Sequence, residues 1–117
     1  MNDAVDRAAL LKMRCSPQPK GAAWGPAEVA AQLARLPGWQ ASGAAIEREF
    51  RFPDFRRAIA FVNAVAVFAD EQDHHPDLEV GWGRCTVRWG THSAAGITVN
   101  DFVCAALTDA AFERGEH

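Results

Sequence analysis

Apolar residues recur at helical spacing in three segments of the chain. In the first, Val29, Leu33 and Leu36 fall three or four positions apart, as on one face of a helix. Pro26 suits the first helical position, where its missing N–H group has no partner to lose. Pro37 cannot continue the pattern. These residues predict a helix that begins at Pro26 and ends before Pro37.

A second apolar stripe predicts a longer helix that begins near Asp54 and ends before Pro76. Its apolar positions keep an i, i+4, i+7 rhythm: Phe55, Ile59, Val62, Ala66 and Ala69. A proline forces the residue before it out of the helical region, so we expect His74 and His75 to stand at the exit of this helix.

A third helix is predicted from Thr98 to about Phe112. Thr98 is a favourable N-cap, and Asp101 stands at the third helical position, as in a capping box. Ile97 before the cap and Phe102 after it have the positions of a hydrophobic staple.

Alternating apolar and polar residues predict two β-hairpins. One occupies residues 39–52 with its turn at 42–43, and the other occupies residues 78–92 with its turn at 83–84. In the second hairpin the apolar face collects Leu78, Val80, Trp82, Cys85, Val87 and Trp89. The opposite face of the sheet carries Glu47, Glu49, Arg51, Thr86 and Arg88, and it is left to water or a partner subunit.

The order of these elements predicts an α+β fold, with a four-stranded antiparallel sheet and three helices on one face, in the order α-β-β-α-β-β-α. We expect residues 24–117 to form this single domain. Residues 1–23 hold prolines and glycines among few large apolar groups, and they predict a partly flexible N-terminal extension.

Composition and charge exclude several classes of function. Among 117 residues the formal net charge is −3, which argues against nucleic acid as a main partner. No run of about 18 apolar residues is present, so we expect no membrane span or membrane partner. The N-terminus lacks the apolar core of a secretory signal. Three widely spaced cysteines do not form a disulfide framework, and we expect a reducing cytoplasm.

Three of the four histidines converge in the expected fold. His74 and His75 precede the second hairpin and His92 follows it, and the two ends of an antiparallel hairpin lie together. Neutral imidazole accepts or donates protons near neutral pH, and nearby carboxylates hold its tautomer. The available carboxylates are those of Asp70, Asp73 and Asp101. The cluster therefore predicts a proton-transfer site.

Other interpretations of the same residues stay open. A histidine beside a proline is often a solvated turn residue. An acid in the first helical turn, such as Asp101, is favoured by the exposed N–H groups alone. Trp82 can serve as a core or interface aromatic rather than a stacking group. Three histidines and a carboxylate could also bind zinc or iron. Adjacent residues in extended chain point to opposite faces, however, and no HxH or HxxxH spacing occurs, so we predict no metal site.

This combination resembles the signature of the pterin-4a-carbinolamine dehydratases, also called dimerization cofactors of a homeodomain transcription factor. The matching positions are "DHHP" at residues 73–76, Trp82, "TH" at residues 91–92, and Asp101. The segments "LARLPGWQ" and "IEREFRFPDFRRAIAFVNAVAVFAD" are similar to that family's first helix, hairpin and second helix, so the resemblance spans roughly residues 24–113. Leu78 departs from a large aromatic in some relatives, and Gly90 from a hydroxyl residue.

The resemblance implies dehydration of 4a-hydroxytetrahydropterin, the product of aromatic amino acid hydroxylases, to quinonoid dihydropterin. It implies no cofactor, because the pterin is itself the substrate. The implied catalytic residues are His74, His75, His92 and Asp101. We interpret His74 and His92 as the proton-transfer pair, with His75 positioning the pterin and Asp101 orienting His92. The implied substrate-binding residues are Asp70, Asp73, Trp82, Thr91 and Ser93.

The resemblance also implies a homodimer or homotetramer, because relatives assemble in these forms. Two other functions stay open. The chain could be an oligomeric module that binds another protein, or it could handle molybdenum-cofactor intermediates.

Overall fold

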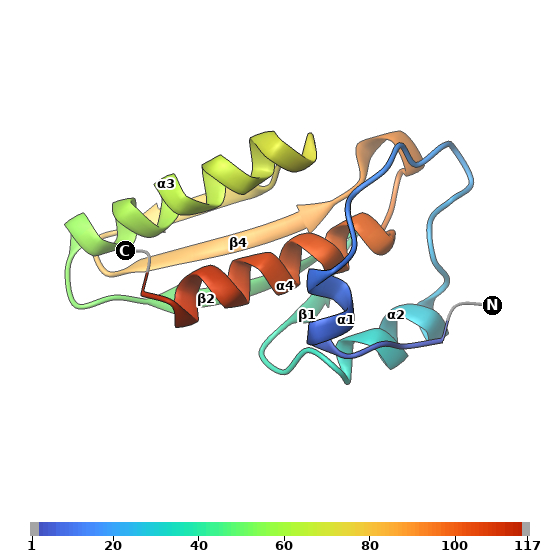
Figure 1. Ribbon diagram of the computed structural model, residues 1–117, viewed down its shortest axis with the longest axis horizontal. Coiled ribbons are helices and arrows are strands. Elements are labelled where there is room, and N and C mark those ends of the chain that lie inside the picture. Colours follow the sequence, from blue (N-terminus) through green and yellow to red (C-terminus); the bar gives the residue numbers. More distant parts are fainter. Residues whose placement is uncertain (1–2, 116–117) are drawn as a thin grey trace.

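A computed structural model describes residues 3–115 of the chain, in which one four-stranded antiparallel sheet is covered by helices (Figure 1). The helices are α1 (Arg7–Leu11), α2 (Pro26–Leu33), α3 (Phe55–Gln72) and α4 (Val99–Glu113), with a short 3₁₀ turn η1 (His92–Ala94) before α4. The strands are β1 (Gln40–Ser42), β2 (Ala45–Arg51), β3 (Asp77–Gly81) and β4 (Arg84–Gly90). Across the sheet their order is β1-β2-β4-β3, so the two hairpins join through β2 and β4.

The α+β prediction is confirmed. The three expected helices are present as α2, α3 and α4, and their start signals hold, because Pro26 opens α2 and Thr98 caps α4. The expected number of helices was too low, since α1 forms inside the N-terminal extension. No helix within residues 3–115 is both long and apolar enough to cross a membrane.

The core lies between the sheet and the two long helices, α3 and α4. Burial alternates along β4, so that Cys85, Val87 and Trp89 are buried while the residues between them are half-exposed. This is the period of a sheet with one covered face. Rings from β2, the loop after it, α3 and α4 fill one end of the core: Phe50, Phe52, Phe61 and Phe112.

The buried face of α3 differs from the predicted stripe. Of the predicted stripe Ala69 is buried, but the other buried residues are Ala58, Phe61 and Val65, each one position before a predicted residue. Phe55, which opens the predicted stripe, is 49% exposed. The helix is apolar around most of its circumference, so spacing alone does not choose the face that meets the sheet.

Helix α3 ends at Gln72, before Pro76 as predicted. Asp73 adopts the left-handed conformation (φ 50°) that commonly terminates helices. Both hairpin turns are displaced by one residue from the prediction: the first lies at residues 43–44 instead of 42–43, and the second at residues 82–83 instead of 83–84. Gly83 is required there, since a Cβ atom would lie 2.8 Å from the carbonyl oxygen of Phe52.

The N-terminal extension contacts the rest of the fold at several points. Leu10 of α1 is fully buried, and the backbone of Val5 exchanges two hydrogen bonds with the side-chain amide of Gln32. Arg7 forms a bidentate ion pair with Glu113 at the end of α4. The predicted flexibility of the extension and the domain boundary at residue 23 stay predictions.

A buried carboxylate joins α4 to β2. Asp109 is almost fully buried; it accepts a hydrogen bond from Trp39 Nε1 and an ion-paired hydrogen bond of 2.8 Å from Arg48. Burial raises the pKa of Asp109, and the contacts with Trp39 and Arg48 oppose that shift. A folded-state pKa above the unfolded one means that this carboxyl favours folding more as the pH falls.

Arg48→Met is therefore expected to lower the free energy of unfolding by about 3 kcal/mol at pH 7, because it leaves the charge of Asp109 buried without its cation. The deficit relative to the unmodified protein should shrink toward pH 5, as Asp109 takes up a proton. Urea unfolding at both pH values measures this. Arg51→Met, at an exposed ion pair with Glu49, serves as the control and should change stability by under about 0.5 kcal/mol. A deficit that grows on acidification would contradict the expectation.

Candidate active site

His74 is held between the sheet and α4. The left-handed turn at Asp73 redirects the chain after α3, and the backbone N–H of His74 donates to the carbonyl of Ala69. The imidazole stacks on the ring of the buried Trp89, with 5.6 Å between the ring centroids and 14° between the ring planes. Its Nε2 lies 2.6 Å from Asp101 Oδ1, and only 10% of the side chain is exposed. His74 is therefore fixed in position and orientation by two independent contacts.

Asp101 is the buried centre of a hydrogen-bond network. It is fully buried in the first turn of α4, where its Oδ2 accepts from the backbone N–H of Thr98 and from Thr91 Oγ1. Thr91 and Thr98 share a further hydrogen bond of 2.8 Å. The capping box is thus confirmed. The histidine that contacts the Asp101 carboxylate is His74, and not His92 as we expected from the resemblance. The left-handed turn at Asp73 changes the direction of the chain after α3 and brings His74 to the start of α4.

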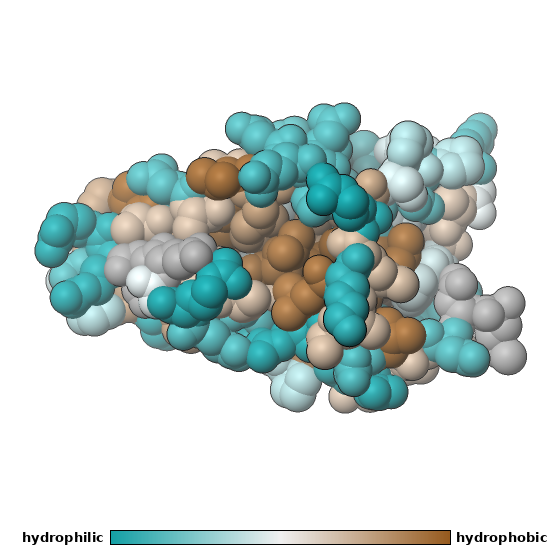
Figure 2. All heavy atoms as spheres, viewed as in Figure 1, coloured by the Kyte–Doolittle hydropathy of each residue, from teal (hydrophilic) through white to brown (hydrophobic). Residues whose placement is uncertain are grey.

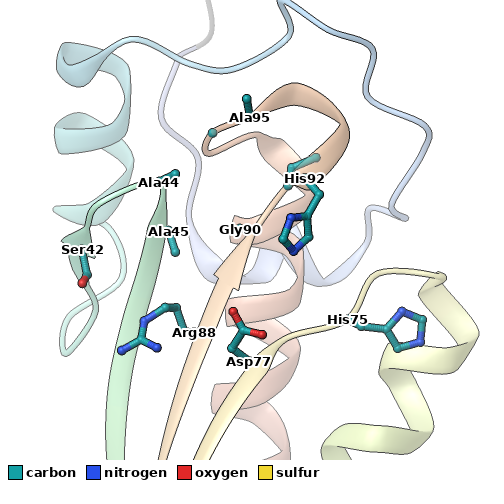
Figure 3. Close-up of a pocket in the computed structure, with 11 residues that line it drawn as sticks. Ser42, Ala44, Ala45, His75, Asp77, Arg88, Gly90, His92 and Ala95 are labelled. Atoms are coloured by element: carbon teal, nitrogen blue, oxygen red, sulfur yellow. The ribbon is translucent and has the colours of Figure 1, made fainter.

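The other two histidines of the cluster, His75 and His92, are exposed. His75 Nε2 is 2.9 Å from Asp70 Oδ1, in a pair that is open to solvent. His92 begins η1 directly after β4, where a bridge between Thr91 and Gly96 closes the turn. Figure 3 shows His92 at the end of β4 and His75 on the segment that follows α3.

Two adjoining cavities meet at these histidines. The first, of about 430 Å³, is lined by Arg88 and Asp77 among others. The second, of about 440 Å³, is lined by His74 and by residues 15–18 of the N-terminal extension. Both are lined by His75, Gly90, Thr91 and His92. Each cavity has the size of a small-molecule site.

The structure brings together most of the predicted site residues. The ones that line the second cavity are Asp73, His74, His75, Thr91, His92 and Ser93. Asp101 forms hydrogen bonds with His74 and Thr91 of this set, and Asp70 contacts His75. Trp82 does not join them: it lies in the turn at the opposite end of the β3–β4 hairpin, 70% exposed. The spacing between Trp82 and His92 along the sequence therefore reflects the length of β4, which separates them, and does not indicate a contact.

Sequence reasoning missed two groups of lining residues. Arg88 and Asp77 face each other as register partners on β4 and β3, and Arg88 also holds Glu47 through two hydrogen bonds to Oε1. The alternating charge on β4 placed Arg88 on the outer face but gave no sign of a cavity there. The 15–18 segment carries no periodic signal at all.

The acidic and imidazole side chains of the cluster do not form a metal-binding set. Among residues 3–115, no three side chains of histidine, cysteine, aspartate or glutamate are grouped so that they could hold an ion. The donor set instead pairs each of two histidines with a single carboxylate, which suits proton transfer.

Residues 22–111 match the family model described as pterin 4 alpha carbinolamine dehydratase. The chain belongs to this family. Its relatives include a provisionally named pterin-4-alpha-carbinolamine dehydratase of Xylella fastidiosa (strain 9a5c), 44% identical, with 98% of this chain and 99% of the relative covered. One of Chromobacterium violaceum is 41% identical, over 90% of this chain and 97% of the relative.

The chain is also similar to solved structures of pterin dehydratase proteins. A transcriptional coactivator/pterin dehydratase from Brucella melitensis aligns with a TM-score of 0.72 and 34% identity, covering 75% of this chain and 96% of that one. A pterin dehydratase-like protein described as a RuBisCO assembly factor aligns with a TM-score of 0.52 and 20% identity, covering 62% of this chain and 83% of that one. This likeness shows the fold alone. The family model begins at residue 22, whereas the alignment with the Xylella fastidiosa relative also covers most of the extension.

Proposed function

We propose that this chain dehydrates 4a-hydroxytetrahydropterins to quinonoid dihydropterins and so recycles the pterin of aromatic amino acid hydroxylases. The observation that carries the proposal is the His74–Asp101 pair, with its 2.6 Å hydrogen bond, beside a cavity that His75 and His92 also line. Membership of the dehydratase family supports the same reaction.

Asp101 prepares His74 to act as a base. A carboxylate only accepts hydrogen bonds, so the proton of neutral His74 sits on Nε2, where it is donated to Asp101 Oδ1. The Nδ1 atom then keeps its lone pair and can take the N5 proton of the pterin. The imidazolium that results is stabilised by Asp101, at the distance of a short charge-assisted hydrogen bond.

His92 acts as the acid in the proposed reaction. It is exposed at the start of η1 and can deliver a proton to the C4a hydroxyl, which leaves as water while the N5–C4a double bond forms. His75 positions the ring. One proton is taken and one is given, and no oxidation state changes, so the proposed reaction calls for no metal or other cofactor. Three free thiols support a location in the cytoplasm.

The direct test is the decay of 4a-hydroxytetrahydropterin generated by a hydroxylase, followed with and without the purified protein. The proposal expects a decay rate that rises in proportion to protein concentration. A decay no faster than in buffer would rule the proposal out. Profiling against several pterins, including molybdenum-cofactor intermediates, separates this substrate class from the alternative one.

A protein-binding role is the second candidate, favoured by the coactivator description of the Brucella melitensis structure. It makes no use of a buried carboxylate–imidazole pair, which explains why we rank it second. A pull-down distinguishes the two functions: a specific partner retained after alanine replaces His74, His75 and His92 would favour the binding module.

We also propose that the chain forms a homodimer or homotetramer. Two large apolar side chains of α3 are exposed, Phe55 and Val67, the latter by 63%. Apolar surface is visible on the face that carries α3 and α4 (Figure 2). A second copy packed against α3 would cover such residues. Light scattering at micromolar concentration should give two or four times the 12.7 kDa chain mass, and a monomer would contradict the proposal.

A further inference from the structure

The N-terminal extension lines the second cavity and is held to the site by hydrogen bonds of its backbone. The N–H of Cys15 donates to Gln72 Oε1 at the end of α3, and Ser16 exchanges two backbone hydrogen bonds with the side chain of Asn100 on α4. Ser93, next to His92, donates to the carbonyl of Gln18 at 2.6 Å. Residues 15–18, which we name the strap, thus form one wall of the second cavity.

Two thiols meet where the strap crosses α4. The Sγ atoms of Cys15 and Cys104 lie 3.5 Å apart, and both cysteines are free. A disulfide bond needs about 2.05 Å between the sulfur atoms, so the two would have to approach by only about 1.5 Å. Cys104 stands three residues after Asp101 on α4, and the contact therefore lies one helical turn from the proposed catalytic pair.

We propose that Cys15 and Cys104 form a peroxide-sensitive dithiol. Its oxidation to an intramolecular disulfide fixes the strap in place as a wall of the second cavity. The proposal does not depend on the dehydratase reaction, because thiol chemistry and strap motion are measured without any pterin.

The two cysteines have different roles in the oxidation. Cys15 is partly exposed, so an oxidant can reach it, and the hydrogen bond from the Cys104 thiol lowers the pKa of Cys15. Cys104 is fully buried, and its hydrogen bond to Cys15 and its desolvation raise its pKa. Cys15 is therefore the thiolate that attacks first, and Cys104 is the thiol that resolves the product.

The reaction balances with hydrogen peroxide as the oxidant. The Cys15 thiolate attacks one peroxide oxygen, an S–O bond forms and the O–O bond breaks, which yields a sulfenic acid and hydroxide. The hydroxide takes up the proton that the Cys15 thiol had lost and becomes one water. The Cys104 sulfur then attacks the sulfenic sulfur, and the hydroxyl group leaves as a second water with the Cys104 proton. Two thiols and one peroxide become one disulfide and two waters. A dithiol reductant reverses the step.

The disulfide would constrain both the strap and the chain as a whole. The contact between the two thiols is lost whenever the strap moves away from α4. The disulfide would replace this contact with a covalent bond. It would also close a loop of about 90 residues between positions 15 and 104, and long loops give the largest stabilisation in the chain-entropy model. Oxidation should therefore slow the opening of the strap and raise the melting temperature.

The experiment compares the full chain before and after treatment with a small excess of hydrogen peroxide. We expect titratable thiols to fall from three to one and a Cys15–Cys104 peptide to be recovered after non-reducing digestion. The melting temperature should rise by roughly 10 °C, with full reversal by dithiothreitol. Exchange of the Ser16 amide hydrogen, bonded to Asn100 Oδ1, should slow at least tenfold.

Cys85 supplies the matched control. It is buried in the sheet opposite Phe50, and desolvation raises its pKa to about 11. Cys85→Ala should oxidise as the unmodified chain does, from two thiols to none. Cys15→Ser, at the more accessible position, should keep both remaining thiols. Cys104→Ala should yield sulfenic acid at Cys15 without the intramolecular bond.

Several outcomes would overturn the inference. Three thiols that persist in excess peroxide would show that the pair is inert. Covalent dimers through Cys15, or overoxidation of Cys15 with Cys104 still reduced, would show that the resolving step does not occur. A disulfide that forms but leaves the exchange of the Ser16 amide unchanged would show that it does not lock the strap.

Discussion

Replacing His92 with alanine is expected to lower the rate constant for dehydration about 100-fold, and His74→Ala is expected to have an effect of similar size. Each substitution removes one of the two proton-transfer groups, and water must then act in its place. His92 is exposed, so its loss should barely change stability. His74 packs on Trp89 and holds Asp101, so its loss should also lower the free energy of unfolding.

This difference in burial separates catalysis from structure. The assay follows 4a-hydroxytetrahydropterin under single-turnover conditions, with the melting temperature measured on the same samples. His92→Ala should show a large loss of rate at an unchanged melting temperature. His75→Ala, if it only positions the pterin, should raise KM more than it lowers kcat. A His92→Ala protein within threefold of the unmodified rate would remove His92 from the mechanism.

Local signals in the sequence were enough to place most elements of the fold. Pro26 and Thr98 mark helix starts because capping and proline geometry depend on residues close by in the chain. The alternation in β4 likewise selects its buried face. The face of α3 could not be derived in this way. Both sides of that helix are apolar, and what chooses between them is packing against β3, β4 and α4.

The convergence of the histidines was predictable, but their partners were not. An antiparallel hairpin brings its ends together whatever its residues are, so His74 and His92 had to approach each other. The partner of Asp101 depends on one backbone angle, the left-handed φ at Asp73, which no spacing encodes. The strap depends on single hydrogen bonds to Gln72, Asn100 and Ser93, and these have no period to detect.

Asp101→Asn is expected to lower kcat about 100-fold while the free energy of unfolding falls by only about 1–2 kcal/mol. The amide has the shape of the carboxylate but only one acceptor oxygen. The backbone N–H of Thr98 and the hydroxyl of Thr91 both donate to the Oδ2 position, so the amide oxygen should take that place. The amide nitrogen then faces His74 Nε2.

That orientation reverses the tautomer of His74. An NH₂ group opposite Nε2 requires Nε2 to accept, so the ring proton moves to Nδ1, and the base of the proposed mechanism is blocked. Nitrogen-15 chemical shifts of the imidazole should report protonation at Nε2 in the unmodified protein and at Nδ1 in the variant. Asp70→Asn makes the same chemical change beside the exposed His75 and should leave kcat within about threefold. If Asp101→Asn kept full activity with the tautomer reversed, His74 would serve the fold and not the chemistry.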